Sequence, residues 1–499
     1  MLGKALSRLL GRPAPAASPV GAAKDRWRAG EHAAAVELLR SQCQALPGDG
    51  EAHALLGGFL IERAREVHAG AAARRGTVIP DSDTCYREAV EHLRRAGALL
   101  PDAAAPLRHC GIALRELGEL AAAHEAFVAA HRAAPQDPDV AADLAFSLQC
   151  LGRTDEAIAL YEQILAGHPE SANAHAGFAL SLLGAGNYAR GWEEYEWRLR
   201  VPRGGIRREF PFPLWQGEDL SGRCLFVYSE QGIGDEIMFA SCFHELLALA
   251  GQCVLESSKR LVPLFERSFP GATILARDRS RMPDWSQLPA IDVHVAAGSV
   301  PRILRYRAQA FPQRDAYLRP DPSRVEHWRE RLMATAGRGR KVGIAWTGGL
   351  PGTLRAARSF SLEALRPLLA TPGASYFALE FLDCGAEVAA FNGGGSERVH
   401  WWPEALKTLD ETAALVAALD LVITVTTATA HLAGALGRPT WVLVPSVPTW
   451  RYMWQGERVP WYASMRVLRG HGPGGATALV EKTRMSLDGF IRSAAPPPD

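Results

Sequence analysis

The chain has 499 residues, with 55 basic and 54 acidic side chains and a formal net charge of +1. Hydrophobic residues make up 47% of the sequence and charged residues 22%, which is ordinary for a globular protein. This length is too great for one hydrophobic core, so we expect two or three domains. The balanced charge argues against a nucleic-acid partner.

Residues 1–21 are expected to form a flexible N-terminal segment. Lys4, Arg8 and Arg12 lie among a few leucines there, so a weak anchor to acidic lipid is the alternative. No apolar run approaches the roughly 18–20 residues of a membrane-spanning helix, and no transmembrane segment is predicted. The 8 cysteines form no CxxC pair and indicate reduced thiols of a cytosolic protein. We expect a cytoplasmic location, with peripheral association at the inner membrane as an alternative.

The first 200 residues repeat. Four series recur at steps of 34 residues: Pro101, Pro135 and Pro169; Gly118, Gly152 and Gly186; Leu114, Leu148 and Leu182; and Leu93, Phe127, Tyr161 and Tyr195. This period resembles the tetratricopeptide repeat, whose unit is a pair of antiparallel helices with Gly at the turn and Pro at the end. We predict about five units over residues 22–200, one of them enlarged by an insert that includes 69–83.

Stacked helix pairs form a solenoid with a concave face. We expect that face to bind a protein partner or an acceptor. A scaffold that only stabilises the next domain or a dimer is the alternative.

From about residue 210, short β-branched runs alternate with helical stretches, which predicts βα units and parallel sheets. Strands are expected at 224–228, 253–258, 272–276, 291–297, 341–346, 375–381, 419–425 and 440–445, with helices near 235–250, 259–267, 361–370, 410–418 and 427–437. We predict two Rossmann-like lobes, an N-lobe over 210–325 and a C-lobe over 340–475, followed by a C-terminal helix and tail over 476–499. Ligands of such sheets bind beyond the carboxyl ends of the strands.

The stretch SEQGIGDEIMFA lies at one such end. Gln231, Gly232 and Gly234 form the predicted cleft turn, and Asp235 directly behind them is a candidate general base. GxGD is a weak signal on its own, and a plain turn is the alternative.

The second lobe offers a helix mouth near Thr427. Its unpaired backbone N–H groups and the hydroxyls of Thr426, Thr427 and Thr429 suit a diphosphate. His431 lies one turn further, where a satisfied core histidine is the alternative. Arg358 could neutralise charge on a leaving phosphate, and a surface arginine is the alternative.

Six stretches occur in an order that identifies a family resemblance over about residues 205–470: LWQGEDLSGRCLFVYSEQGIGDEIMFA, VGIAWTGG, RSFSLEAL, DETAALVAALDLVITV, AHLAGALGRPTWVLVP and WRYMWQGERVPWYASMRVLR. With the repeats before them, they resemble bacterial tetratricopeptide-repeat glycosyltransferases. The catalytic part is similar to glycosyltransferase family 9, the ADP-heptose:lipopolysaccharide heptosyltransferase family. The resemblance implies a GT-B fold and metal-independent inversion, with a nucleotide sugar as co-substrate, no other cofactor and no metal site.

The resemblance also implies roles for single residues. Asp235 matches the proposed base, and Arg358 matches the residue that contacts donor phosphate. The remaining donor-binding candidates are Trp346, Thr347, Gly348, Thr426, Thr427, Ala428, Thr429 and His431. Thr426 departs from the family, which usually has at that position an Asp expected to contact the donor sugar. Glu380 likewise replaces a more usual Gln.

These features predict an inverting glycosyltransferase that transfers a sugar to a hydroxyl of a glycan or protein acceptor. The alternative is a non-catalytic repeat scaffold with a degenerate transferase domain, which Thr426 favours. A nicotinamide-dependent oxidoreductase fits poorly, because Ile237 stands where GxGxxG needs its third glycine.

Overall fold

The computed structural model describes residues 18–73, 82–201, 208–278, 280–349, 354–445, 449–470 and 474–493, without the side chains of 67–73. The chain forms two compact units. The first comprises residues 1–181, 197–203 and 350–357, and the second comprises 182–196, 204–349 and 358–499. Most of the predicted N-terminal segment and residues 74–81 of the predicted insert lie outside the described residues. The domain boundaries given above remain predictions.

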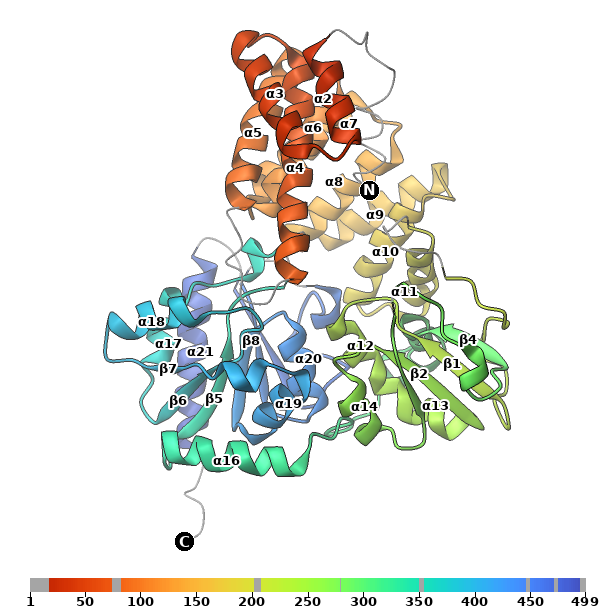
Figure 1. Cartoon of the computed structure of the whole chain (residues 1–499), viewed down its shortest axis with the longest axis vertical. Coiled ribbons are helices and arrows are strands. Elements are labelled where there is room, and N and C mark those ends of the chain that lie inside the picture. The colour runs from red at the N-terminus through yellow and green to blue at the C-terminus, as the bar shows by residue number, and fades with distance from the viewer. Residues whose placement is uncertain are drawn as a thin grey trace. The chain divides into compact units, whose positions relative to one another are not determined.

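The first unit is helical (Figure 1). Neighbouring helices pack in pairs, α2 with α3, α4 with α5, α6 with α7 and α8 with α9, as the repeat predicts. Their bounds are α2 Pro19–Arg28, α3 His32–Ala45, α4 Gly50–Ala73, α5 Ser82–Leu99, α6 Ala104–Glu116, α7 Leu120–Ala133, α8 Pro138–Cys150 and α9 Thr154–Gly167. Helix α10 (Ala172–Gly184) ends in the second unit, which also contains α11 (Tyr188–Tyr195).

The repeated glycines have a conformational reason. Gly30, Gly118, Gly152 and Gly186 follow the first helix of a pair, with φ between 77° and 85°. Residues with a Cβ are strained in this left-handed region, so glycine recurs where the chain turns into the second helix. The large residues of the repeat, such as Phe127 and Tyr161, are at most 1% exposed and form the core between helices.

The second unit contains two parallel sheets. The first has the order β3-β2-β1-β4, with β1 Cys224–Tyr228, β2 Gln252–Ser257, β3 Thr273–Ala276 and β4 Val293–Ala296. Its helices are α12 Ile233–Phe239, α13 Phe243–Leu249, α14 Val262–Ser268 and α15 Val300–Leu304. The single helix expected near 235–250 is thus two helices, separated by the 3-10 turn η2, Ala240–Cys242.

The second sheet has the order β10-β9-β8-β5-β6-β7. Its strands are β5 Arg340–Ala345, β6 Ala374–Ala378, β7 Val399–His400, β8 Leu421–Val425, β9 Thr440–Val444 and β10 Met465–Arg469. Its helices are α16 Pro322–Ala336, α17 Arg366–Leu369, α18 Gly385–Gly393, α19 Leu409–Ala418, α20 Ala428–Ala435 and α21 Gly475–Arg492. β7 and β10 were not predicted. Helix α21 lies where the C-terminal helix was expected.

Short 3-10 helices connect these elements. They are η1 Glu196–Leu199, η3 Trp285–Gln287, η4 Ala297–Ser299, η5 Ala308–Ala310, η6 Ala356–Arg358, η7 Glu363–Leu365, η8 Pro403–Leu406 and η9 Trp450–Tyr452.

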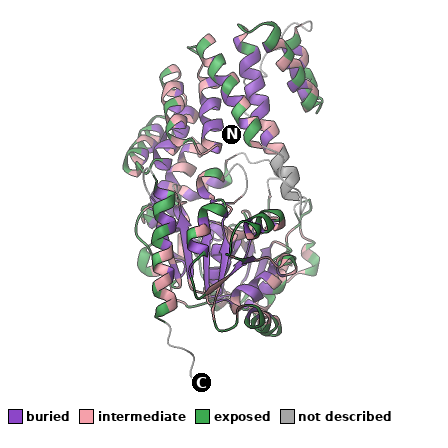
Figure 2. Ribbon diagram, turned by 90° about the vertical axis from the view of Figure 1, so that its left-hand side faces the viewer, coloured by how far each residue is buried: buried purple, intermediate pink, exposed green. Residues whose placement is uncertain are grey.

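Both sheets have the Rossmann arrangement. Strand order reverses at β1/β4 in the first sheet and at β5/β8 in the second, and ligands bind outside the carboxyl ends of strands at such points. Central strands such as β8 and β9 are buried along their whole length, as parallel strands covered on both faces are (Figure 2). Within the described residues, no helix is both long and apolar enough to cross a membrane.

Candidate functional site

The mouth of α12 carries the candidate base. Strand β1 ends at Tyr228, and Gly232 precedes α12 in an extended conformation, which places Asp235 in the first helical turn. The Asp235 side chain is 16% exposed, and the Nε of Arg451 donates to its Oδ1 over 2.6 Å. Burial by itself would lower the pKa of Arg451, but the charge and hydrogen bond of Asp235, together with the charges of Tyr195 and Tyr452, raise it overall. The candidate base is therefore held in an ion pair.

Helices α12 and α20 approach each other closely. A Cβ added at Gly234 would lie 3.1 Å from Cδ2 of His431 and 3.4 Å from Cα of Ala428. Only a residue without a side chain allows this approach without a shift of its neighbours. The predicted cleft turn and the predicted donor-side helix are thus adjacent.

His431 is fully engaged. It is 5% exposed, its Nδ1 lies 2.9 Å from the Tyr462 hydroxyl and its Nε2 lies 3.2 Å from the Tyr452 hydroxyl. Burial lowers the pKa of His431 to about 3, and the charge of Arg451 adds to this effect. The imidazole is neutral and satisfied, so it positions α20 and has no ring nitrogen left for proton transfer.

The first turn of α20 lacks a side-chain cap. Thr427 precedes the helix and makes no capping hydrogen bond with any described residue, while its Oγ1 lies 3.3 Å from Oγ1 of Thr424. Thr429 is 1% exposed, and its hydroxyl has no hydrogen-bond partner within the described part of the chain. A helix mouth without a side-chain cap, next to a buried hydroxyl without a described partner, is suited to an anionic ligand.

Arg358 links two of the predicted turns. Its Nη1 donates to the carbonyl and the hydroxyl of Thr426, both at 3.3 Å, and its Nη2 donates to the Gly348 carbonyl at 3.1 Å. The side chain is buried, which excludes the surface alternative. Arg358 is the last residue of η6, and the helix expected near 361–370 is instead the 3-10 turn η7 followed by the four-residue helix α17. Thr426 is held against Arg358.

The turn after β5 is anchored by Glu380. The backbone N–H groups of Trp346 and Thr347 donate to Oε1 of Glu380 over 2.5 and 2.8 Å. The Gly348 N–H donates to Oγ of Ser359 over 2.8 Å. These donors of the predicted donor-binding turn are therefore already used within the protein.

Two further residues flank the α12 mouth. The Gln231 amide donates to the Tyr195 hydroxyl over 2.8 Å. Glu236, 3% exposed, accepts from the Ser258 N–H over 2.7 Å and pairs with Arg277 at 3.0 Å. Burial raises the pKa of Glu236 to about 7, although the Ser258 and Arg277 contacts act in the opposite direction.

Sequence reasoning did not assign Arg451, Tyr452 or Tyr462. All three lie in the stretch WRYMWQGERVPWYASMRVLR, which was used only for the family resemblance. The signal available was a basic residue within an unusually aromatic segment. The partner of that basic residue, Asp235, is 216 positions away and could not be read from the pattern.

No family model matches the chain. The chain is 35% identical over 401 residues to protein FlbA of Caulobacter vibrioides, a match that covers 76% of this chain. The chain spans 66% of the length of FlbA, slightly less than two thirds.

Parts of the chain are also similar to solved structures. They include MamA, with 18% identity, a TM-score of 0.30 and coverage of 36% of this chain and 92% of MamA. A tetratricopeptide-repeat protein of Thermus thermophilus, TTC0263, has 20% identity and a TM-score of 0.28, and the match covers 36% of this chain and 89% of TTC0263. A glycosyl transferase family 9 protein of Veillonella parvula has 11% identity and a TM-score of 0.41, and the match covers 56% of this chain and 100% of that protein.

The fold rests on the helix pairs, the strand orders and the parallel registers described above. They match the tetratricopeptide solenoid and the two-lobed GT-B-type domain that the family resemblance predicted. The predicted fold class is confirmed.

Proposed function

We propose that the chain is an inverting, metal-independent glycosyltransferase that moves a sugar from a nucleotide-sugar donor to a hydroxyl of a glycan or protein acceptor. The observation that carries the proposal is the close approach of α12 and α20 at Gly234, with a Cβ there 3.4 Å from Cα of Ala428. A carboxylate on one helix mouth and an uncapped anion-binding mouth on the other suit transfer from an activated phosphate donor.

In this proposal Asp235 accepts the proton of the acceptor hydroxyl. The hydroxyl oxygen attacks the anomeric carbon from the face opposite the diphosphate, and the bond from that carbon to the diphosphate oxygen breaks. The bonding electron pair leaves with the nucleotide diphosphate, and the configuration inverts. Arg451 orients the carboxylate through its 2.6 Å contact, and it loses its charge partner when Asp235 takes up the proton.

The donor diphosphate is proposed to lie at the mouth of α20. The hydroxyl of Thr429, which has no partner among the described residues, and the N–H groups of the first turn would donate to its oxygens. Arg358 joins the turns after β5 and β8 and would compensate the developing charge. No cofactor beyond the nucleotide sugar is required, and we propose a cytoplasmic enzyme whose solenoid recruits the acceptor or a protein partner.

A second candidate is a non-catalytic scaffold that keeps the transferase fold. Two observations favour it. The hydroxyl of Thr426 is bonded to Arg358 and stands where a sugar-binding carboxylate is expected. The Glu380 carboxylate occupies N–H groups in the turn after β5.

The test is a thermal-shift screen with ADP-, GDP-, UDP-, CMP- and dTDP-linked sugars and with the bare nucleotides. A bound donor stabilises the fold by about 2.7 kcal/mol at 100 times its Kd, so a selective shift names the donor class. Hydrolysis of that donor by the protein alone would support catalysis. A folded sample that responds to none of them supports the scaffold.

A matched pair of threonines sharpens the screen. Thr429→Val removes a hydroxyl without a described partner, so it should weaken donor binding and leave the unfolding free energy nearly unchanged. Thr412→Val in α19 removes a buried hydroxyl that donates to the Ala405 carbonyl over 3.0 Å, so it should reduce stability and leave donor binding unchanged. Equal donor affinity in both variants contradicts the proposed diphosphate site.

A further inference from the structure

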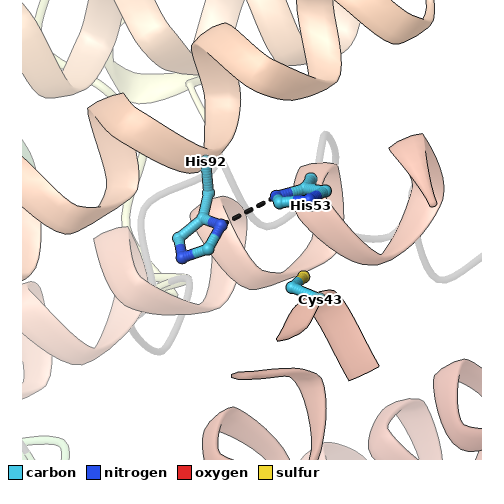
Figure 3. A group of neighbouring side chains, drawn as sticks. All are labelled: Cys43, His53 and His92. Atoms are coloured by element: carbon cyan, nitrogen blue, oxygen red, sulfur yellow. Dashed lines mark hydrogen bonds between the residues drawn. The ribbon is translucent and has the colours of Figure 1, made fainter. Parts of the chain in front are cut away.

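Three side chains of the kinds that bind metal ions lie close together in the first unit. Cys43 lies in the last turn of α3, His53 in the first turn of α4 and His92 in the middle of α5. The sulfur and one nitrogen of each ring lie within 4.8 Å of one another (Figure 3). Each ligand comes from a different helix, so the group joins the first helix pair to the second.

The two imidazoles point at each other through the same atom. The Nδ1 of His53 lies 2.8 Å from the Nδ1 of His92, and the ring planes are inclined by 34°. Such a contact needs one protonated and one bare nitrogen, so the rings cannot both be charged. Burial lowers the pKa of both histidines, and the charge of His53 lowers that of His92 further. A neutral imidazole with a bare nitrogen is the form that binds metals.

The thiol completes a soft ligand set. Cys43 is 6% exposed. Burial, together with the charge of Asp49, raises the pKa of Cys43 to about 11, so without a cation the thiol keeps its proton. The Asp49 carboxylate accepts from the Gln42 amide over 2.8 Å and from the Ala52 N–H over 3.0 Å. It is fixed beside the cluster and contributes negative charge that a bound cation would compensate.

We propose that Cys43, His53 and His92 bind a zinc ion. A thiolate with two imidazoles is a set that zinc prefers, and a water would fill the fourth tetrahedral position. Zinc–nitrogen bonds of about 2.0–2.1 Å at tetrahedral angles need nitrogens about 3.3 Å apart, so the rings would separate by only about half an ångström. On binding, the thiol proton leaves to solvent and the shared Nδ1 proton is replaced by one on Nε2 of the same ring.

A bound zinc ion would link α3 to α4 and α5. Helices α4 and α5 form the repeat unit that carries the insert, where the 34-residue spacing is lost. A metal that binds the folded chain more tightly than the unfolded chain contributes its binding free energy to folding. This role is independent of the proposed transfer reaction.

The experiment uses the untagged full-length protein. After dialysis against a chelator it is titrated with ZnCl2, with CoCl2 as a spectroscopic probe and with MgCl2 as a hard-cation control. We expect equimolar zinc by elemental analysis and a rise in Tm with zinc that the chelator reverses. We also expect a thiolate-to-cobalt charge-transfer band in the near ultraviolet, and no effect of magnesium.

Three variants locate the site. Cys43→Ala should lose the charge-transfer band, and His92→Gln should weaken zinc binding by more than the roughly 10–100-fold that loss of an outer-shell partner costs. Cys110→Ala is the matched control, because that thiol is also buried, at 4% exposure, and lies outside the cluster. If Cys43→Ala does not fold, His92→Gln decides the question. Retention of zinc by the cluster variants, or no zinc and no cobalt band in the unsubstituted protein, overturns the proposal.

Discussion

Two buried histidines distinguish the two units. His431 in the second unit and His109 in α6 of the first are both at most 5% exposed, and burial lowers the pKa of each to about 3. His431 has a tyrosine hydroxyl on each ring nitrogen. Neither nitrogen of His109 has a hydrogen-bond partner among the residues that the structure describes. The cost of burying the imidazole is thus offset by hydrogen bonds for His431, whereas no described residue offsets it for His109.

Two ion pairs also differ between the units, and here the first unit has the more buried pair. Arg108 and Asp143 in the first unit are paired over 2.6 Å with side chains at most 7% exposed. Arg451 and Asp235 in the candidate site are 21% and 16% exposed. A pair that excludes water holds helices together, whereas a partly exposed pair leaves its carboxylate within reach of a substrate. The buried pair of the first unit therefore suits a structural role, and the more exposed pair of the second unit suits the proposed site.

The largest expected effect is on turnover. Asp235→Asn should reduce the rate of sugar transfer by about 10²–10⁴-fold while donor binding is retained, because general-base help is worth that much. The measurement is single-turnover transfer, with donor affinity by calorimetry. Glu236→Gln is the control, since that neighbouring carboxylate is bonded to Ser258 and Arg277. Equal losses in both variants would assign the effect to local structure instead of proton transfer.

The next effect is on the stability of the second unit. His431→Leu should cost about 1–3 kcal/mol for each tyrosine hydroxyl left without its partner. The change is read from urea unfolding at pH 8, and hydrogen exchange on peptides of α12 and α20 shows where it acts. If the variant unfolds at the same urea concentration as the unsubstituted chain, the tyrosine contacts do not hold α20.

Glu236 gives a pH dependence of known sign. Its pKa is about 7 in the folded chain against a reference of 4.5, so the folded state binds the extra proton between these values. Its contribution to stability is therefore present below about pH 4.5 and is lost as pH rises to about 7, by about 3 kcal/mol at 1.36 kcal/mol per unit. Glu236→Gln should flatten this part of the curve. If the unfolding free energy changes by the same amount between pH 5 and pH 8 in Glu236→Gln and in the unsubstituted chain, the assignment is contradicted.

The smallest expected effect is on the stability of the first unit, and its sign is opposite to that of His431→Leu. His109→Leu should stabilise the first unit by about 1 kcal/mol, because it removes a buried polar ring that has no described partner. Hydrogen exchange in α6 and α8 measures the local opening free energy. Destabilisation by an amount similar to that of His431→Leu would show that the two histidines are equally satisfied.

Much of the fold could be read from the sequence because its causes are local. Glycines recur every 34 residues since each turn needs a positive φ, and the large residues recur since each helix pair needs a core. β-Branched runs separated by helical stretches specify parallel strands. Two strands escaped prediction. β7 has only two residues, and β10 lies in a stretch that was read as a motif.

The sequence by itself determined which helix mouths and strand ends carry reactive side chains, since these follow from the order of short segments. Only the tertiary structure decided which of them meet. It paired Asp235 with Arg451, satisfied His431 with two tyrosines, and used Glu380 to anchor the turn after β5. It also gathered Cys43, His53 and His92 from three helices. Their spacing follows no motif because contacts between elements depend on packing, and packing brings distant positions together without leaving a local pattern.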